Sequence, residues 1–274
     1  ALDGMHARLD GSVIGLLGAN GSGKTSLLRI LAGVASPSRG EAIVDGQPMT
    51  AGRHPWISYL PQETGFFPFL QHPARTLSLS MTFRGVTDPD APYKLLEALG
   101  LQDEDRSAGG FSGGMKQKLR IAQALVHAPR LLLLDEPTTG LDSRERLRVL
   151  RLMDRLRDRV GIVLSTHDPS DAAAVCDVVC VLHRGRLVAD GPPEALRQFA
   201  AGKVYEMDVP SGPLPSVTDG EVIKAERVGD AFRVRVLGRP PSAGIAVEPT
   251  LADAYMLLTK GGSAGGAPPF GGMV

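Results

Sequence analysis

The stretch SVIGLLGANGSGKTSLLRILAG, residues 12–33, sets the expected fold of this chain. It opens on a short apolar run, passes through a glycine-rich turn and continues into a segment whose Leu27, Leu28 and Leu31 share one helical face. The turn, GANGSGKT at residues 18–25, fits the P-loop pattern with both glycines, the lysine and the threonine in register. Because that pattern requires a strand before it and a helix after it, the stretch predicts the start of an α/β unit with a phosphate-binding turn.

The P-loop predicts a binding site for nucleotide phosphates. Backbone N–H groups of residues 21–25 and the dipole of the following helix would surround the β-phosphate. The ammonium of Lys24 would meet the β- and γ-phosphates, and the Thr25 hydroxyl would ligate Mg²⁺. A chance glycine-rich turn is the alternative, and the flanking strand and helix argue against it. The expected nucleotide contacts are Gly18, Asn20, Gly21, Ser22, Gly23, Lys24, Thr25 and Ser26.

A second motif is LLLLDEP, residues 131–137, where a buried strand ends in two carboxylates. Ligands bind α/β sheets at the carboxyl ends of the strands, so both carboxylates are expected near the phosphates. Asp135 would hold Mg²⁺ through its water shell, and Glu136, aimed the other way, would orient or deprotonate the attacking water of a phosphoryl transfer. Taken alone, the pair also has a plainer interpretation, because strands often end in charged residues.

The segment FSGGMKQK, residues 111–118, begins a helix with Ser-Gly-Gly. The first N–H groups of a helix have no partner within it, and glycine leaves them accessible, so Ser112, Gly113 and Gly114 can bind an anion. A nucleotide held by the P-loop would hardly need a second phosphate site in the same chain. From the residues alone, a solvated helix start explains this Ser-Gly-Gly segment equally well.

The rest of the chain alternates between strand and helix signals, which favours an α/β fold with a largely parallel sheet. Further strands are expected within 41–46, 56–62, 161–168, 178–191, and an amphipathic helix at 143–160. We expect a core over residues 1–200 with a helical insertion at about 66–127, a small α/β appendage at 201–260 and a flexible tail at 261–274.

Composition narrows the function classes. The 274 residues include 30 basic and 30 acidic side chains and are 43% hydrophobic, so a full core is expected and no net charge recruits nucleic acid or an anionic membrane. No apolar run approaches the ~20 residues of a membrane-spanning helix and no secretory signal is visible, so a cytoplasmic location is expected. The only cysteines, Cys176 and Cys180, are expected to be small buried apolar residues rather than metal ligands.

Six motifs in order carry a resemblance to the ATP-binding subunits of ABC transporters. They are the P-loop at 18–25, YLPQ ending at Gln62, SGGMKQ at 112–117, LLLLDEP at 131–137, TGLDS at 139–143 and STHD with His167. The resemblance covers about residues 1–200. It implies a P-loop NTPase of the ABC ATPase type with a helical subdomain, which binds ATP and Mg²⁺ and hydrolyses the ATP.

The resemblance also implies a use for the Ser-Gly-Gly segment. In this family the segment of one subunit caps the γ-phosphate of ATP held by the P-loop of the other, so that two subunits sandwich two nucleotides head to tail. Ser112, Gly113 and Gly114 would then complete the nucleotide site of a partner subunit, and Asp142 would reach across the same interface. A homodimer is the expected assembly.

Two further roles come from the same resemblance. Gln62 would meet Mg²⁺ and the attacking water while its loop touches a membrane partner, and His167 would hydrogen-bond the γ-phosphate. A lone histidine after a strand is usually a surface or satisfied residue, but its place in STHD at a sheet edge favours the phosphate role. Met115 follows Ser-Gly-Gly where the family often has Gln, a variant associated with exporters.

The C-terminal part, with PTLADAY near its end, resembles more loosely the tail of ATPase subunits from ABC-2-type exporters. The implied function is ATP hydrolysis that drives export through a permease on a separate chain, with the ATPase peripheral to the inner face of the cell membrane. An importer subunit is the alternative, because the core motifs are shared. An ABC-type ATPase acting on nucleic acid is disfavoured by the neutral charge, the single cassette and the short separation of Gln62 from Ser112.

Two local features remain open. Family members usually stack adenine on an aromatic residue upstream of the P-loop, and no Phe, Tyr or Trp precedes Gly18, so we expect a truncated N-terminus. The run GFFPFL presents Phe66, Phe67 and Phe69 close to the YLPQ motif. These aromatic side chains are expected either to dock a permease helix or to form a small core under the helical insertion.

Overall fold

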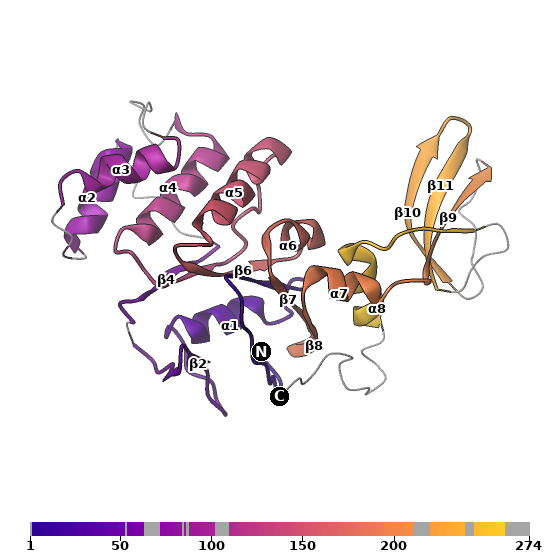
Figure 1. The fold of residues 1–274 in the computed structure, drawn as a ribbon, viewed down its shortest axis with the longest axis horizontal. Helices are drawn as coiled ribbons and strands as arrows, with labels where there is room; N and C mark the ends of the chain where they lie inside the picture. The colour runs from indigo at the N-terminus through magenta and orange to yellow at the C-terminus, as the bar shows by residue number, and fades with distance from the viewer. Residues whose placement is uncertain are drawn as a thin grey trace.

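The computed structural model describes residues 2–52, 54–62, 72–83, 85, 88–101, 110–210, 220–238 and 244–260. Phe66, Phe67 and Phe69, and the expected flexible tail at 261–274, lie outside the described residues. The described part is an elongated α/β molecule with a helical region at one end and a separate antiparallel sheet at the other (Figure 1).

A six-stranded sheet forms the centre of the molecule. In spatial order its strands are β4 (Ile57–Leu60), β5 (Leu131–Leu134), β6 (Gly161–Thr166), β1 (Val13–Leu17), β7 (Val178–His183) and β8 (Arg186–Gly191). Neighbours from β4 to β7 pair in parallel, and β8 returns antiparallel from β7. The predicted α/β class is confirmed. Strand order reverses beside β1, and ligands bind α/β sheets at the carboxyl ends of strands around such a point.

Alternation along the strands divides the core into two layers. Leu132 and Leu134 of β5 belong to one hydrophobic cluster and Leu133 between them to another, because successive strand side chains point to opposite faces. Helix α1 (Lys24–Leu31) packs on the face of Leu133, where its Leu28 is fully buried. Among the helices that the structure describes, α1 is the one that contributes residues to the hydrophobic cluster on this face.

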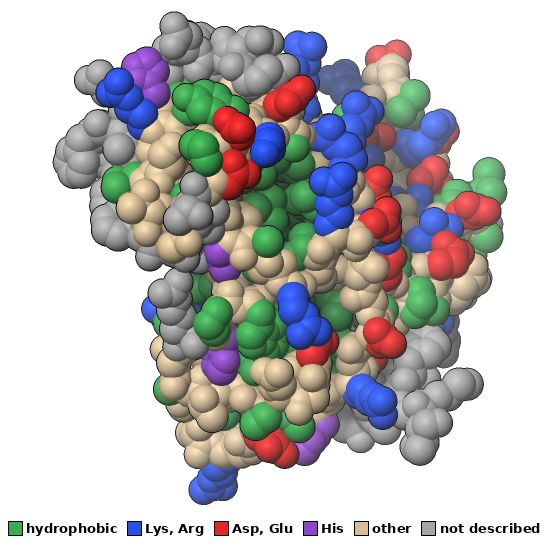
Figure 2. Space-filling model, turned by 60° about the vertical axis from the view of Figure 1, so that its left-hand side comes forward, with side chains coloured by type: hydrophobic (Ala, Val, Ile, Leu, Met, Phe, Trp, Pro, Cys, Tyr) green, Lys and Arg blue, Asp and Glu red, His purple; other side chains and the backbone are tan. Residues whose placement is uncertain are grey.

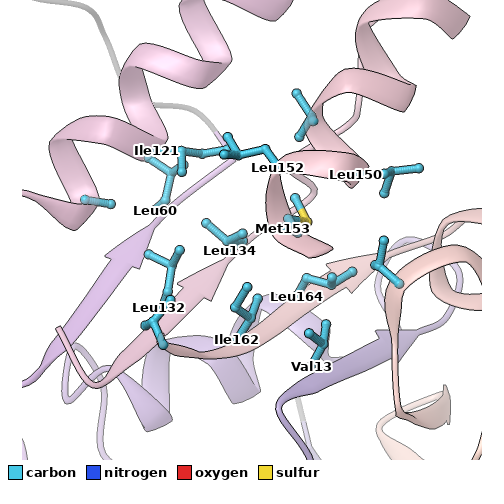
Figure 3. Close-up of a cluster of buried hydrophobic side chains, with 14 of the residues drawn as sticks. Val13, Leu60, Ile121, Leu132, Leu134, Leu150, Leu152, Met153, Ile162 and Leu164 are labelled. Carbon is cyan, nitrogen blue, oxygen red and sulfur yellow. The ribbon is translucent and has the colours of Figure 1, made fainter. Parts of the chain in front are cut away.

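The opposite face is covered by α4 (Gly113–Leu125), α5 (Ser143–Leu156) and α6 (Pro169–Val175) (Figure 1). Figure 3 shows Ile121 of α4 and Leu152 of α5 above the strand leucines of this face. Each fully buried leucine or isoleucine contributes about 1.5–3 kcal/mol by leaving water. This layer packs directly against β5, β6 and β1.

The expected helical insertion is present among the described residues. Helices α2 (Pro73–Phe83) and α3 (Ala91–Ala98) pack beside α4. Leu77 of α2 and Leu96 of α3 join the hydrophobic cluster that also contains the sheet leucines. The insertion therefore shares its core with the central sheet.

The two strand-like runs before the insertion belong to different sheets. WISYLPQ contributes β4 to the central sheet, whereas EAIVDG contributes only β2 (Ile43–Val44), which pairs with β3 (Gln47–Pro48) outside that sheet. The turn between β2 and β3 has Asp45 at φ 49° and Gly46 at φ 75°, the left-handed values of a two-residue hairpin. Asp45 and Gly46 therefore form the turn of this hairpin.

The C-terminal part forms a second, antiparallel sheet. Its strands, in spatial order, are β10 (Gly220–Val228), β11 (Ala231–Gly238), β9 (Val204–Pro210) and β12 (Ile245–Ala246). The chain leaves the core after α7 (Pro193–Gln198) and returns to it in α8 (Leu251–Lys260), which packs against α6 and α7 (Figure 1). Leu251 and Leu258 of α8 join the main core cluster. We propose that residue 200 marks the boundary between the core and the C-terminal appendage at 201–260.

Helix α8 begins with a reciprocal capping contact. Thr250 Oγ1 accepts from the Asp253 N–H at 3.3 Å, and Asp253 Oδ2 accepts from the Thr250 N–H at 2.6 Å. Arg235 of β11 donates to both carboxylate oxygens of Asp253 and to Glu206 Oε1. This largely buried ion pair ties the second sheet to the helix that docks on the core.

Cys176 and Cys180 are both buried and carry free thiols. Burial raises the pKa of Cys176 to about 12, so this thiol stays neutral at physiological pH.

The described residues include no group of three or more His, Cys, Asp or Glu side chains that could hold a metal ion by itself. In that same part of the chain, every helix is too short or too polar to cross a membrane. The face in Figure 2 carries cations and carboxylates interspersed, in line with a formal net charge of zero.

Candidate functional site

The P-loop joins the carboxyl end of β1 to the first turn of α1, and several of its positions require glycine. A Cβ on Gly18 would lie 2.5 Å from the carbonyl oxygen of Leu182. Gly23 has a left-handed φ of 109° immediately before the helix starts at Lys24. The loop can therefore fold its backbone tightly around a ligand at the helix N-terminus.

The Lys24 side chain is buried beneath the loop. Its ammonium donates to the carbonyl oxygens of Gly18 and Ala19 at 2.6 and 3.3 Å, and lies 3.2 Å from Glu136 Oε1. A buried charge needs such partners, because taking it out of water is costly. The cation of the P-loop thus contacts the second carboxylate of the LLLLDEP strand end.

Three hydroxyl groups meet at Asp135, which follows β5. Asp135 Oδ1 accepts from Ser165 Oγ at 2.6 Å and from Thr25 Oγ1 at 3.2 Å, and Oδ2 accepts from the Tyr59 hydroxyl at 3.4 Å. Burial, followed by the charge of Asp135, raises the pKa of Tyr59 to about 12, so the phenol stays protonated as a donor. The Thr25 hydroxyl and the Asp135 carboxylate place two oxygens side by side, the ligand type that Mg²⁺ prefers.

Glu136 has a left-handed backbone, φ 49°, which is uncommon for a residue with a side chain. Its Oε2 accepts from Thr139 Oγ1 at 3.0 Å and from His167 Nδ1 at 2.7 Å. Burial by itself would raise the pKa of this carboxyl, but the Lys24 charge and hydrogen bonds from His167, Lys24 and Thr139 outweigh burial and hold the pKa below its ordinary value. Glu136 is therefore a carboxylate at neutral pH.

The Ser-Gly-Gly segment forms the N-terminus of α4. Ser112 is the N-cap, and its Oγ accepts from the Met115 N–H at 3.2 Å. Gly113 is exposed, whereas Gly114 is buried against α5, where a Cβ would lie 2.6 Å from the Cβ of Glu145. Gly114 is thus needed for helix packing, and Ser112 and Gly113 form the exposed part of the segment.

Asp142 and Gln62 are both exposed. Asp142 is the N-cap of α5, and its Oδ1 accepts from the N–H groups of Arg144 and Glu145, both at 2.9 Å. Gln62 lies two residues beyond β4, and its carbonyl oxygen accepts from Arg120 Nη2 at 3.2 Å. Asp142 therefore stabilises its own helix, whatever else it contacts.

The structure brings the P-loop, Asp135, Glu136 and His167 together at one edge of the sheet. Among the described residues, no hydrogen bond or ion pair links this group to the Ser-Gly-Gly segment or to Asp142. Within the described part of one chain, the two glycine-rich phosphate sites expected from the sequence are therefore not connected by a hydrogen bond or an ion pair.

The sequence motifs do not indicate that Ser165, Tyr59 and Thr139 contact the two carboxylates. Ser165 stands inside the quoted STHD motif, and the pairing of Leu134 with Leu164 makes the residues that follow them neighbours. A strand alignment would therefore have revealed Ser165, whereas motif spacing does not.

The chain is similar to ATP-binding proteins of known transporters. The sequence profile described as ABC transporter matches residues 6–139. The Nod factor export ATP-binding protein I of Burkholderia orbicola is 37% identical over 276 residues, covering 91% of this chain and 88% of its own. The spermidine/putrescine import ATP-binding protein PotA of Protochlamydia amoebophila is 38% identical over 192 residues, covering 67% of this chain and 51% of its own, so the chain spans about half of that relative. A solved structure of an ATP-binding subunit of an ABC transporter is similar with a TM-score of 0.61 and 29% identity, covering 72% of this chain and 86% of that one.

Proposed function

Because this chain belongs to the ABC transporter family, we propose that it is the ATP-hydrolysing subunit of an exporter whose permease is a separate chain. The chain is an ABC-type ATPase. In this proposal two copies bind two ATP molecules head to tail, and hydrolysis releases the pair. The cycle of closing and opening drives the permease.

The observation that carries the proposal is the convergence of Lys24, Thr25, Asp135 and Glu136 at the carboxyl ends of β1 and β5. Phosphoryl transfer depends on positioning and charge stabilisation more than on a covalent nucleophile. An ammonium, a hydroxyl and two carboxylates beside a helix N-terminus supply those functions. The P-loop residues, from Gly18 to Ser26, would hold the phosphates.

Thr25 and Asp135 fit a magnesium ion, because they present adjacent oxygens next to the phosphate-binding loop. Gln62, exposed beyond the end of the neighbouring strand β4, is proposed as a further ligand. When bound, Mg²⁺ would neutralise charge on the β- and γ-phosphate oxygens. The protein's part is to orient the Asp135 carboxylate and the Thr25 hydroxyl toward the same point.

Glu136 is proposed as the base that takes a proton from the attacking water. The water oxygen bonds to the γ-phosphorus, the bond to ADP breaks, and the proton passes to the Glu136 carboxylate. An ATP phosphate that attracts the Lys24 ammonium would weaken the contact between Lys24 and Glu136. Since that contact lowers the pKa of Glu136, its basicity would rise when substrate is in place. His167, on the same carboxylate, is proposed to turn one ring nitrogen to the γ-phosphate.

The exposed Ser112 and Gly113 are proposed to complete the site of a partner copy, with Asp142 at the same interface. Their N–H groups open a 13-residue helix, and the positive end of a helix dipole attracts phosphate. The buried Gly114 would support this surface from behind. One nucleotide would then contact the P-loop of one chain and the Ser-Gly-Gly segment of the other.

Export is favoured over import by the extent of similarity. The exporter relative matches 91% of this chain, which includes the C-terminal part, whereas the importer relative matches 67%. Together with Met115 and PTLADAY, this supports an exporter subunit at the cytoplasmic face of the membrane, bound there through its permease.

Phosphate release by the purified 274-residue chain tests the ATPase step. With ATP and Mg²⁺, the wild-type chain should release phosphate, and Thr25→Ala should lose at least ~10-fold of that activity because the hydroxyl beside Asp135 is gone. Thr82→Ala, which removes an exposed hydroxyl on α2, is the matched control and should change nothing. Equal activity in Thr25→Ala and Thr82→Ala would remove Thr25 from the magnesium site.

The direction of transport is tested in cells whose chain is replaced by the Lys24→Ala variant. Mass spectrometry of the medium and of cell extracts should reveal a compound that disappears from the medium and accumulates inside. A compound that instead remains in the medium and is depleted from the cells would favour an importer.

A further inference from the structure

Ser165 of β6 is a fully buried serine to which the proposed function gives no role. Its Oγ donates to Asp135 Oδ1 at 2.6 Å and accepts from the Glu136 N–H at 2.9 Å. The first of these bonds has the short length typical of a hydroxyl that donates to a carboxylate. One side chain therefore contacts both residues of the strand end at once.

Strand register places Ser165 there. Leu134 of β5 pairs with Leu164 of β6, so Asp135 and Ser165, the residues that follow, are neighbours. Leu164 points into the hydrophobic cluster of Figure 3, and Ser165 therefore faces the other way. On its other side Ser165 pairs with Leu16 of β1. The Ser165 side chain is fully buried, so its bonds to the strand end are not exchanged for bonds to solvent.

The bond to the Glu136 N–H acts on an unusual backbone. Glu136 has φ 49° and precedes Pro137, whose ring disfavours the right-handed helical conformation at the residue before it. Left-handed residues with side chains persist only where their surroundings determine the conformation. Here Ser165 Oγ accepts a hydrogen bond from the Glu136 N–H, and the Thr139 N–H donates to the Glu136 carbonyl oxygen at 3.2 Å.

We infer that Ser165 is a positioning residue for ATP hydrolysis: its hydroxyl orients the Asp135 carboxylate for Mg²⁺ and fixes the backbone from which the Glu136 side chain projects. The inference rests on the proposed function. Without the hydroxyl, Asp135 loses a donor and the Glu136 N–H loses its acceptor, so both carboxylates can move. The phosphate contacts of the P-loop do not pass through Ser165 and are kept.

The test compares Ser165→Thr with Ser165→Val in the full 274-residue chain. Both substitutions place a branched side chain of the same shape on β6, and they differ only in the hydroxyl, so any packing cost is common to both. Ser58→Ala is the matched control, because Ser58 is a buried serine of β4, 3% exposed, that bonds neither carboxylate. Ser58→Ala should behave as wild type.

Two readouts are measured for each variant. In steady-state ATPase assays Ser165→Thr should stay near wild type, whereas Ser165→Val should lose ~10–100-fold in kcat, with KM for ATP changed less than ~3-fold. In thermal melts with a non-hydrolysable ATP analogue, addition of Mg²⁺ should raise the Tm of wild type and Ser165→Thr, and raise that of Ser165→Val much less.

Equal kcat and equal Mg²⁺-dependent shifts in the Thr and Val variants, with an active wild type, would overturn the inference and leave the proposed function standing. A wild-type chain that neither hydrolyses ATP nor is stabilised by the analogue would overturn the proposed function and the inference with it.

Discussion

Lys24 and Glu136 form a buried ion pair, with Nζ 3.2 Å from Oε1 and side chains that are 6% and 5% exposed. The pair joins the P-loop directly to the strand end that follows β5. Because each charge lies out of water, each depends on the other for compensation. The contact therefore affects the stability of the fold as well as the chemistry of the site.

Removing one of the two charges should lower the free energy of unfolding. Lys24→Met leaves the Glu136 carboxylate buried without its cation, so the free energy of unfolding should fall by about 3 kcal/mol. Adding Glu136→Gln removes the stranded charge, and the double variant should be more stable than Lys24→Met alone. Urea unfolding of the wild type, both single variants and the double variant measures this coupling. Strictly additive losses would mean that the two charges do not interact.

The stability of the chain should depend on pH through Glu136. Its pKa is lower in the folded chain than the 4.5 of an unfolded glutamate, so its contribution is fully present above about pH 4.5 and is lost as pH falls through the folded pKa. Wild type should therefore lose more unfolding free energy than Glu136→Gln between pH 5 and the acid limit of folding (on the order of pH 3). Parallel pH profiles for the two chains would contradict the lowered pKa.

Glu136→Gln should also separate nucleotide binding from hydrolysis. The amide cannot accept a proton from water, so turnover should fall by at least ~100-fold while ATP is still bound. Glu97→Gln on the exposed face of α3 is the control for the same change elsewhere. Phosphate release and equilibrium binding of ATP measure the two properties. Turnover close to wild type would exclude Glu136 as the base.

The thermal stability of the chain should depend on the contact between Arg235 of the second sheet and Asp253 of α8. Asp253 is 2% exposed in its side chain, so Asp253→Asn leaves the Arg235 charge partly unpaired and should cost about 3 kcal/mol of stability. Asp208→Asn breaks the exposed pair with Arg233 on the same sheet and should leave the Tm unchanged. Equal thermal shifts in the two variants would show that burial of the Arg235 pair is unimportant.

The parts of the site that could be predicted from sequence are those whose geometry is local. The P-loop carries its own turn and helix start, and Asp135 and Glu136 follow an apolar strand directly, so each motif indicates where its side chains lie. His167 directly follows β6, so its position at the same sheet edge could be predicted as well.

Contacts between distant segments could not be predicted in this way. Ser165 and Tyr59 reach Asp135 through the register of three strands, and motif spacing does not contain that register. Gly114 was expected to face an anion, but its burial against Glu145 depends on how α4 crosses α5. The return of α8 to the core likewise depends on packing that no single segment encodes.

In the proposed function, the P-loop of one chain and the Ser-Gly-Gly segment of another hold the same nucleotide. Gly113 is the position at which to test it, because a Cβ there meets only Leu141 Cδ2 at 3.4 Å, an ordinary contact, whereas a Cβ on Gly114 would collide with Glu145. Gly113→Asp adds a carboxylate that repels phosphate and suits the start of α4. Gly113→Asn has the same shape without the charge.

The deciding measurement is the molar mass of these variants by size-exclusion chromatography with light scattering, with ATP and Mg²⁺ and in a Glu136→Gln background that blocks hydrolysis. We predict that the Glu136→Gln chain and its Gly113→Asn form become dimers with ATP. The Gly113→Asp form should stay monomeric while it binds ATP as tightly as the others at low protein concentration. A Gly113→Asp chain that still dimerises with ATP, or one whose monomer loses ATP affinity as severely as Lys24→Ala, would contradict the claim.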